Sequence, residues 1–137
     1  MSDEKKKKLY MLSIVVSIVI IVASIIIIIR VSKPKVDYES MGKEISQYTS
    51  QLENVVHVKA VSDSIFDITL EGDSWYSGSD RDKRKFCKSV NETLTVICQK
   101  YKVIRDIETA HVYYYDEDGI KIAEPGKGVT LESTILH

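Results

Sequence analysis

The sequence lacks the short motifs that mark most enzymes. Neither a G-x-S-x-G nucleophile turn nor a glycine-rich phosphate loop occurs in its 137 residues. Its two cysteines and three histidines have no partner at metal-ligand spacing. Because no acid, base and nucleophile stand together, we expect no catalytic residues, no metal, no cofactor and no enzymatic activity.

Acidic residues are scarce at the start of the chain, where the basic residues collect. Residues 1–35 hold seven Lys or Arg and two acids, so 12 of the 19 basic residues and 18 of the 20 acidic residues fall in 36–137, which carries a net charge of −6. An acidic domain repels phosphate backbones, so we expect no nucleic-acid partner.

Residues 9–29 contain no charged side chain and read LYMLSIVVSIVIIVASIIIII. At 1.5 Å per residue, a helix of this length spans about 32 Å, close to the hydrocarbon thickness of a bilayer. The run is longer than the core of a signal peptide and no small-x-small cleavage site follows it. The sequence therefore predicts a single-pass transmembrane helix that acts as an uncleaved signal anchor.

The flanking charges predict how this helix would be oriented in the cell membrane. The tail at residues 1–8 carries four consecutive lysines, and the linker at residues 30–36 carries Arg30, Lys33 and Lys35. The positive-inside rule then places the N-terminus in the cytoplasm and the C-terminal domain outside the cell, with the lipid bilayer as a partner. Ser13, Ser17 and Ser24 share one helical face, which would either associate with another membrane helix or bond carbonyls of its own helix.

A second helical pattern follows the linker. Asp37 is a candidate cap, and apolar or aromatic residues recur at steps of three and four. Two interpretations remain open for this stripe: it packs on the sheet of its own domain, or it forms a short coiled-coil seam that joins copies or a partner. Its first four members are Tyr38, Met41, Ile45 and Tyr48.

The rest of the chain alternates between strand and helix patterns. Strands are expected at 55–61, 65–71, 107–115 and 120–123, a loop at 72–80 and a long helix at 81–101. The order α-β-β-α-β-β predicts the α+β class, with a mainly antiparallel sheet in a domain at 37–125 and a C-terminal tail at 126–137.

Aromatic residues provide further candidate contacts for a partner. Trp75 and Tyr76 lie in the expected loop, where they either anchor a partner or fold back onto the sheet. The consecutive tyrosines Tyr113, Tyr114 and Tyr115 place rings on both faces of one strand, so Tyr113 and Tyr115 are candidates for a partner-facing surface.

The two cysteines and an acidic turn allow more than one interpretation. Cys87 and Cys98 are eleven residues apart on one expected helix, too far for a disulfide between them, so they are core residues or reach another chain. The stretch Asp116-x-Asp118-Gly119 resembles part of a calcium loop, but the acidic ligands required elsewhere are missing, and a hairpin turn explains it better.

Taken together, these patterns predict a membrane-anchored accessory or assembly subunit of a bacterial cell-envelope complex. It would act by protein–protein interaction through an extracytoplasmic domain, with a protein partner or as a homo-oligomer. The alternative is a module that binds a small ligand or a lipid in a cleft between the long helix and the sheet.

Overall fold

The chain divides into two units, Met1–Lys35 and Val36–His137. The computed structural model describes residues 3–14 of the first unit and all of the second. Residues 3–14 are helical and exposed throughout.

The transmembrane helix predicted for residues 9–29 is contradicted by the structure. Within the two described ranges, none of the helices combines the length and the apolar character that a membrane crossing requires. Residues 9–14 are the described part of the predicted span, and residues 15–29 lie outside the described residues. Three further predictions depended on that helix: the signal anchor, the single-pass topology and the cell-membrane localisation. The same finding contradicts them. Ser13 lies in the described helix, whereas Ser17 and Ser24 lie outside the described residues.

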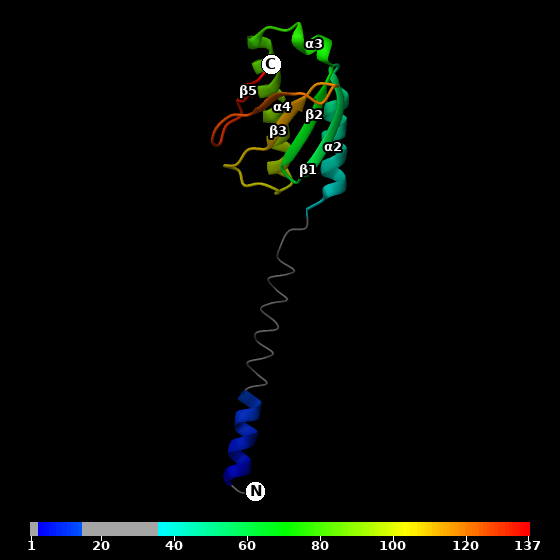
Figure 1. Cartoon of the computed structure of the whole chain (residues 1–137). Helices are drawn as coiled ribbons and strands as arrows, with labels where there is room; N and C mark the ends of the chain where they lie inside the picture. Colours follow the sequence, from blue (N-terminus) through cyan, green and yellow to red (C-terminus); the bar gives the residue numbers. More distant parts are fainter. Residues whose placement is uncertain (1–2, 15–35) are drawn as a thin grey trace. The chain divides into compact units, whose positions relative to one another are not determined.

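The second unit is an α+β structure built on a five-stranded mixed sheet (Figure 1). The strands stand in sequence order, and three of their four pairings are antiparallel. The pairing of β2 with β3 is parallel because the chain crosses over through two helices between them. The elements are α2 (Tyr38–Ser50), β1 (Val55–Ser62), β2 (Ile65–Leu70), α3 (Gly72–Tyr76), α4 (Asp80–Lys100), β3 (His111–Tyr115), β4 (Lys121–Pro125) and β5 (Ser133–Ile135).

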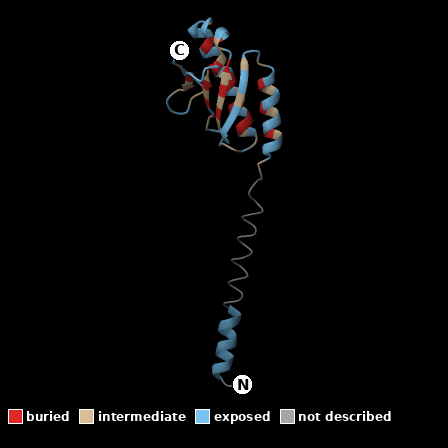
Figure 2. Cartoon of the chain, turned by 45° about the vertical axis from the view of Figure 1, so that its right-hand side comes forward, coloured by how far each residue is buried: buried red, intermediate tan, exposed pale blue. Residues whose placement is uncertain are grey.

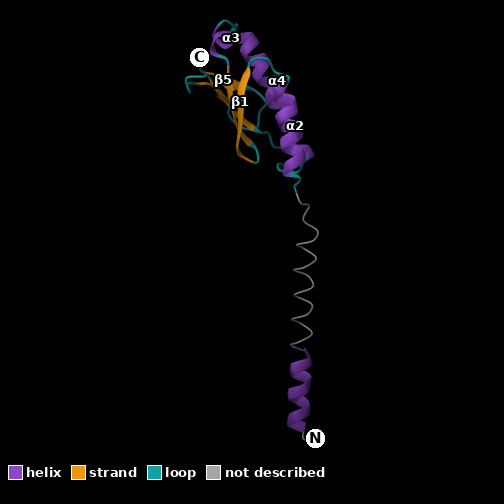
Figure 3. Cartoon of the chain, turned by 90° about the vertical axis from the view of Figure 1, so that its right-hand side faces the viewer, coloured by secondary structure: helices purple, strands orange, loops and turns teal. Residues whose placement is uncertain are grey.

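Helices α2 and α4 cover one face of the sheet, which makes two layers (Figure 3). The alternation in β2 sets this arrangement, since Phe66, Ile68 and Leu70 are buried while the residues between them are half-buried. The buried residues gather between the helices and the strands, and the outer sides of α2 and α4 are exposed (Figure 2).

Local signals explain where the two long helices begin. The Asp37 side chain accepts a hydrogen bond from the Ser40 backbone N–H (3.0 Å), and Ser79 does the same for Asp82 at the start of α4. Asp80 and Asp82 lie in the first turn of α4, where the helix dipole favours acids. Both helices are thus specified by residues near their own ends.

The structure differs from the expected domain in three places. The expected loop at 72–80 contains the short helix α3, and strand β3 begins at His111, four residues later than predicted. The expected tail contains β5, which pairs with β4. A turn closes this pair, in which Gly126 N–H donates to Glu132 O (3.0 Å). A β-carbon at Gly126 would meet that same oxygen at 3.0 Å, so glycine avoids a tight contact at this close approach.

Candidate functional site

An open groove runs between α2 and the edge strand β1. Its main part encloses about 400 Å³, and a neighbouring part of about 340 Å³ extends it towards the start of α2. Gly42, Ile45, Ala60 and Phe66 line both parts, so the two form one continuous surface. The groove is completed by Ser46, Thr49, Ser50, Val55, Val56, His57 and Val58 in the main part, and by Tyr38, Met41, Ser62 and Asp63 in the extension.

Small residues keep this groove open. Met41, Ile45 and Thr49 hold α2 against the domain, while Gly42 faces open space, since a β-carbon there would meet nothing within 4 Å. Across the groove, Ala60 is opposite Phe66 on the neighbouring strand, and the buried Phe66 ring forms the floor. A larger side chain at the glycine would occupy the groove without displacing the core.

Strand β1 borders the groove and forms one edge of the sheet. Within residues 36–137 it pairs with β2 on one side, and no strand covers its other side. Irregular pairing at both ends of β1 leaves Val56 and Val61 exposed, at 57% and 53%. The regularly paired stretch between these irregularities, residues 57–60, contains no proline, so its outer edge is open to an added strand, although Lys59 and the two irregularities restrict where that strand can pair.

The lining of the main part of the groove is almost free of charge. Among its described residues there is no carboxylate, lysine or arginine, and His57 is its one titratable side chain. This neutrality contrasts with the net charge of −6 over residues 36–137. The acidic charge of the domain therefore lies elsewhere on its surface.

Polar contacts hold α2 in place around the groove. The Tyr38 hydroxyl donates to Asp63 Oδ2 (2.9 Å), and this bond to a carboxylate raises the pKa of Tyr38. Lys100 Nζ donates to Glu44 Oε1 (2.6 Å), which raises the pKa of Lys100 and lowers that of Glu44. The first contact joins α2 to the β1–β2 turn and the second joins it to α4.

The α2 residues singled out in the sequence divide between core and groove. Met41 and Ile45 are buried against their own domain, Tyr48 is half-buried and packs against the core, and Tyr38 is exposed. This placement follows the interpretation in which the stripe packs on its own sheet. Met41, Ile45 and Tyr38 nevertheless line the groove.

The Trp75–Tyr76 pair lies at the other end of the domain from the start of α2. Trp75 is folded back, with 6% of its surface exposed and its Nε1–H donating to His137 O (2.9 Å). Tyr76 is 48% exposed, and its hydroxyl donates to Asp116 Oδ2 (2.7 Å). The structure thus uses both rings to join α3 to the C-terminal segment and to the β3–β4 turn.

Tyr113 and Tyr115 lie on the opposite face of the sheet from the groove. They pair with Asp67 and Thr69, whereas Tyr114 between them is fully buried on the helix side. Lys121 Nζ lies 5.6 Å from the Tyr113 ring centroid. The structure therefore does not bring these two tyrosines together with the α2 residues in one site.

The cysteines are both free and buried. Burial raises the pKa of Cys87 to about 12 and that of Cys98 to about 11. A thiol with so high a pKa is almost entirely protonated near neutral pH and is a poor nucleophile. Their place in the core fits the interpretation of small packing residues.

A smaller cavity of about 180 Å³ lies between α4 and the end of the sheet. Leu70, Trp75 and Phe86 line it together with Lys83, a largely buried lysine. Lys83 Nζ lies 5.5 Å from the Trp75 ring centroid and 3.4 Å from His137 O. Its ammonium group therefore already contacts an aromatic ring and a carbonyl oxygen.

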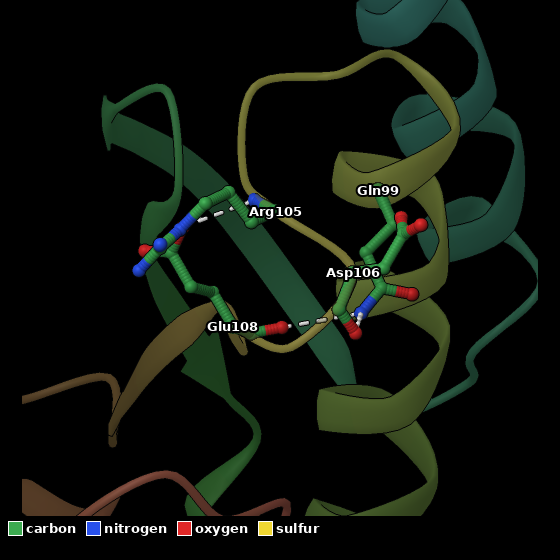
Figure 4. Close-up of polar contacts among 4 residues, drawn as sticks. All are labelled: Gln99, Arg105, Asp106 and Glu108. Carbon is green, nitrogen blue, oxygen red and sulfur yellow. Dashed lines mark hydrogen bonds and ion pairs between the residues drawn. The ribbon is translucent and has the colours of Figure 1, made fainter.

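The loop that follows α4 is held by its own polar groups (Figure 4). Gln99 Nε2 donates to the carbonyls of Asp106 and Glu108 (3.1 Å each), and Arg105 Nε donates to Glu108 Oε1 (2.8 Å).

Among the residues that the structure describes, no cluster of three or more His, Cys, Asp or Glu could hold a metal ion.

The residues that shape the groove most directly were not identified from the sequence. Gly42, Val56 and Ala60 are not among the candidate site residues that the sequence indicates. A usable signal was present, because the strand pattern at residues 55–61 holds one charged residue and no proline. Comparison with protein-family models, with curated proteins and with solved structures found no match, so function is inferred from geometry alone.

Proposed function

We propose that residues 36–137 form a protein-interaction module, and that the protein is an accessory or assembly subunit that acts by binding rather than catalysis. The module takes an extended segment of a partner as an additional strand along β1. One observation carries this proposal: an open eight-residue edge strand borders an apolar groove.

Strand addition uses both features of this site. The backbone of β1 supplies hydrogen bonds along its outer edge, and these give affinity with little dependence on sequence. Alternate side chains of the added strand point towards the helix layer, where Val58 and Ala60 leave apolar surface accessible. The uncharged lining of the main part of the groove favours a segment whose groove-facing residues are apolar, since a buried charge would lack a partner there.

A small-ligand module is the second candidate, favoured by the cavity between α4 and the sheet. Lys83 and the rings of Trp75 and Phe86 could hold a small amphipathic molecule. The cavity of about 180 Å³ is below the roughly 300–1,000 Å³ typical of ligand sites. The groove beside β1 therefore carries the first proposal.

The test is selection of random displayed peptides of about eight residues on the full-length chain, followed by binding of the enriched peptides to two variants. Gly42→Leu fills the groove, and leucine is a better helix former than glycine, so α2 is not weakened. Lys43→Leu introduces the same side chain at the next, exposed position, which does not line the groove.

We expect enriched peptides to alternate apolar and polar residues and to bind the wild type and Lys43→Leu equally. Binding of these peptides to Gly42→Leu should be at least about tenfold weaker, because the leucine occupies the groove and the peptide loses its apolar contacts there. Equal binding to all three proteins, or no enrichment, would contradict the proposed function.

A further inference from the structure

We infer that the strand added along β1 is the same strand of a second copy of this chain, so that two sheets join edge to edge through antiparallel β1–β1 pairing. This inference rests on the proposed function and names the partner. It follows from the symmetry of the edge, the side chains of β1 and the distribution of charge.

An antiparallel edge is complementary to itself. Rotating one copy of β1 by a half-turn presents the same sequence of donors and acceptors to the first copy, so each contact occurs twice. The residues of β1 are already extended, and residues 57–60 pair with β2 without a break in register. Pairing therefore orders little new backbone, in contrast to the binding of a flexible peptide.

The side chains of β1 match the groove that they would enter. Five of the eight residues are valine or alanine, and Val56 and Val61 are exposed. Val58 and Ala60 face the helix layer, because they pair with the buried Ile68 and Phe66. In a joined sheet, these residues of each copy lie beside the groove of the other.

Charge restricts the pairing to particular registers. Lys59 pairs with Asp67 and so lies on the open face of the sheet, away from the groove. A register centred on Lys59 would place two lysines directly opposite each other and is disfavoured. A register centred on Val58 or Ala60 avoids this contact. It also keeps the groove-facing side chains of both copies on the same face of the joined sheet.

The acidic domain as a whole repels a second copy, but the edge does not. Lys59 is the one charged residue of β1, and the main part of the groove contains neither carboxylate nor ammonium groups. Edge-to-edge contact therefore brings together surfaces with few charged groups, Lys59 on the strand and Asp63 in the extension of the groove. Added salt should strengthen the association, because it screens the remaining repulsion between the domains.

Disulfide trapping in the full-length chain tests this inference. Single cysteines are placed at each position from Val56 to Val61, and the formation of linked dimers is measured under mild oxidation. Directly opposed strand residues lie within disulfide reach, whereas residues further from the two-fold axis do not. The buried Cys87 and Cys98 should give no linked dimer in the wild type.

We expect one maximum, at Val58→Cys or Ala60→Cys, with yield falling on both sides. Val96→Cys on α4, which is 55% exposed and so similar to Val56, should give no dimer. Absence of linked dimers, or equal yields at all positions including Val96, would overturn β1–β1 pairing.

The outcome separates this inference from the proposed function. If enriched peptides bind and lose affinity with Gly42→Leu while no cysteine links two copies, the groove binds a different protein and the second copy is excluded. If dimers form with a maximum on β1 but Gly42→Leu leaves both trapping and peptide binding unchanged, the edge pairs without the groove and the proposed mode of binding is wrong.

Discussion

At the scale of single residues, the centre of the domain is held by one polar contact network. The buried Tyr114 hydroxyl donates to Asn91 Oδ1 (2.7 Å), and Asn91 Nδ2 donates to Leu131 O (2.8 Å) and Ser133 Oγ (2.7 Å). The pKa of Tyr114 is raised well above its ordinary value, chiefly by burial. These bonds join β3, α4 and the segment that contains β5.

Tyr114→Phe should lower the free energy of unfolding by about 1–3 kcal/mol, because it leaves the buried Asn91 oxygen without its donor. Tyr113→Phe, which makes the same change on the open face, should alter it by less than about 0.5 kcal/mol. Urea unfolding of both variants measures the difference. Equal effects would show that the network does not stabilise the fold.

At the scale of elements, the β3–β4 turn depends on one carboxylate. Asp116 Oδ1 accepts hydrogen bonds from the backbone N–H groups of Asp118 (3.0 Å) and Ile120 (2.9 Å), and Oδ2 accepts from Tyr76. Gly119 has φ of +84°, a conformation that favours glycine. The bond from Tyr76, followed by those from the backbone, lowers the pKa of Asp116 below its usual value of 3.8.

This lowered pKa predicts the pH dependence of the turn. The ionised carboxylate stabilises the folded state at pH values above 3.8, and this contribution is lost as the pH falls through the lower folded-state pKa. Asp116→Asn should therefore be less stable than the wild type at about pH 6, and the difference should shrink towards about pH 3. Urea unfolding over this range measures it, and a difference that grows in acid would contradict the assignment.

At the scale of the whole molecule, the two edges of the sheet differ. The β1 edge is eight residues long and borders the groove, whereas the β5 edge is three residues long. Helix α2 is joined to α4 by the Glu44–Lys100 ion pair and to the β1–β2 turn by Tyr38. Within residues 36–137, the sheet therefore has one long edge, at β1, that no other strand covers.

Amide hydrogen exchange should reveal this difference in the unpaired protein. The amides of residues 55–62 that point away from β2 should exchange at least about ten times faster than those of 65–70, which lie between two strands. Raising the protein concentration should slow exchange in 55–62 selectively if copies pair through β1. Uniform protection of both strands at the lowest concentration would show that β1 is not an open edge.

Much of this architecture could be predicted because it depends on neighbours in sequence. The spacing of apolar residues located α2 and α4 and the hairpin of β1 and β2, and Asp37 marked where α2 starts. The separation of Cys87 and Cys98 along one helix excluded a bond between them, because helical rise is a local quantity. Hydropathy alone misled at residues 9–29, where the predicted membrane span was wrong.

Contacts between distant segments were decided only by the tertiary structure. Strand order, the parallel pairing of β2 with β3 and the capture of β5 depend on how helices and loops pack across the chain. The same packing turned Trp75 inward and placed Met41 and Ile45 in the core. It also left Gly42 facing empty space beside β1. Periodicity determines which face of an element is apolar, but only the packed molecule determines which of those faces stay open.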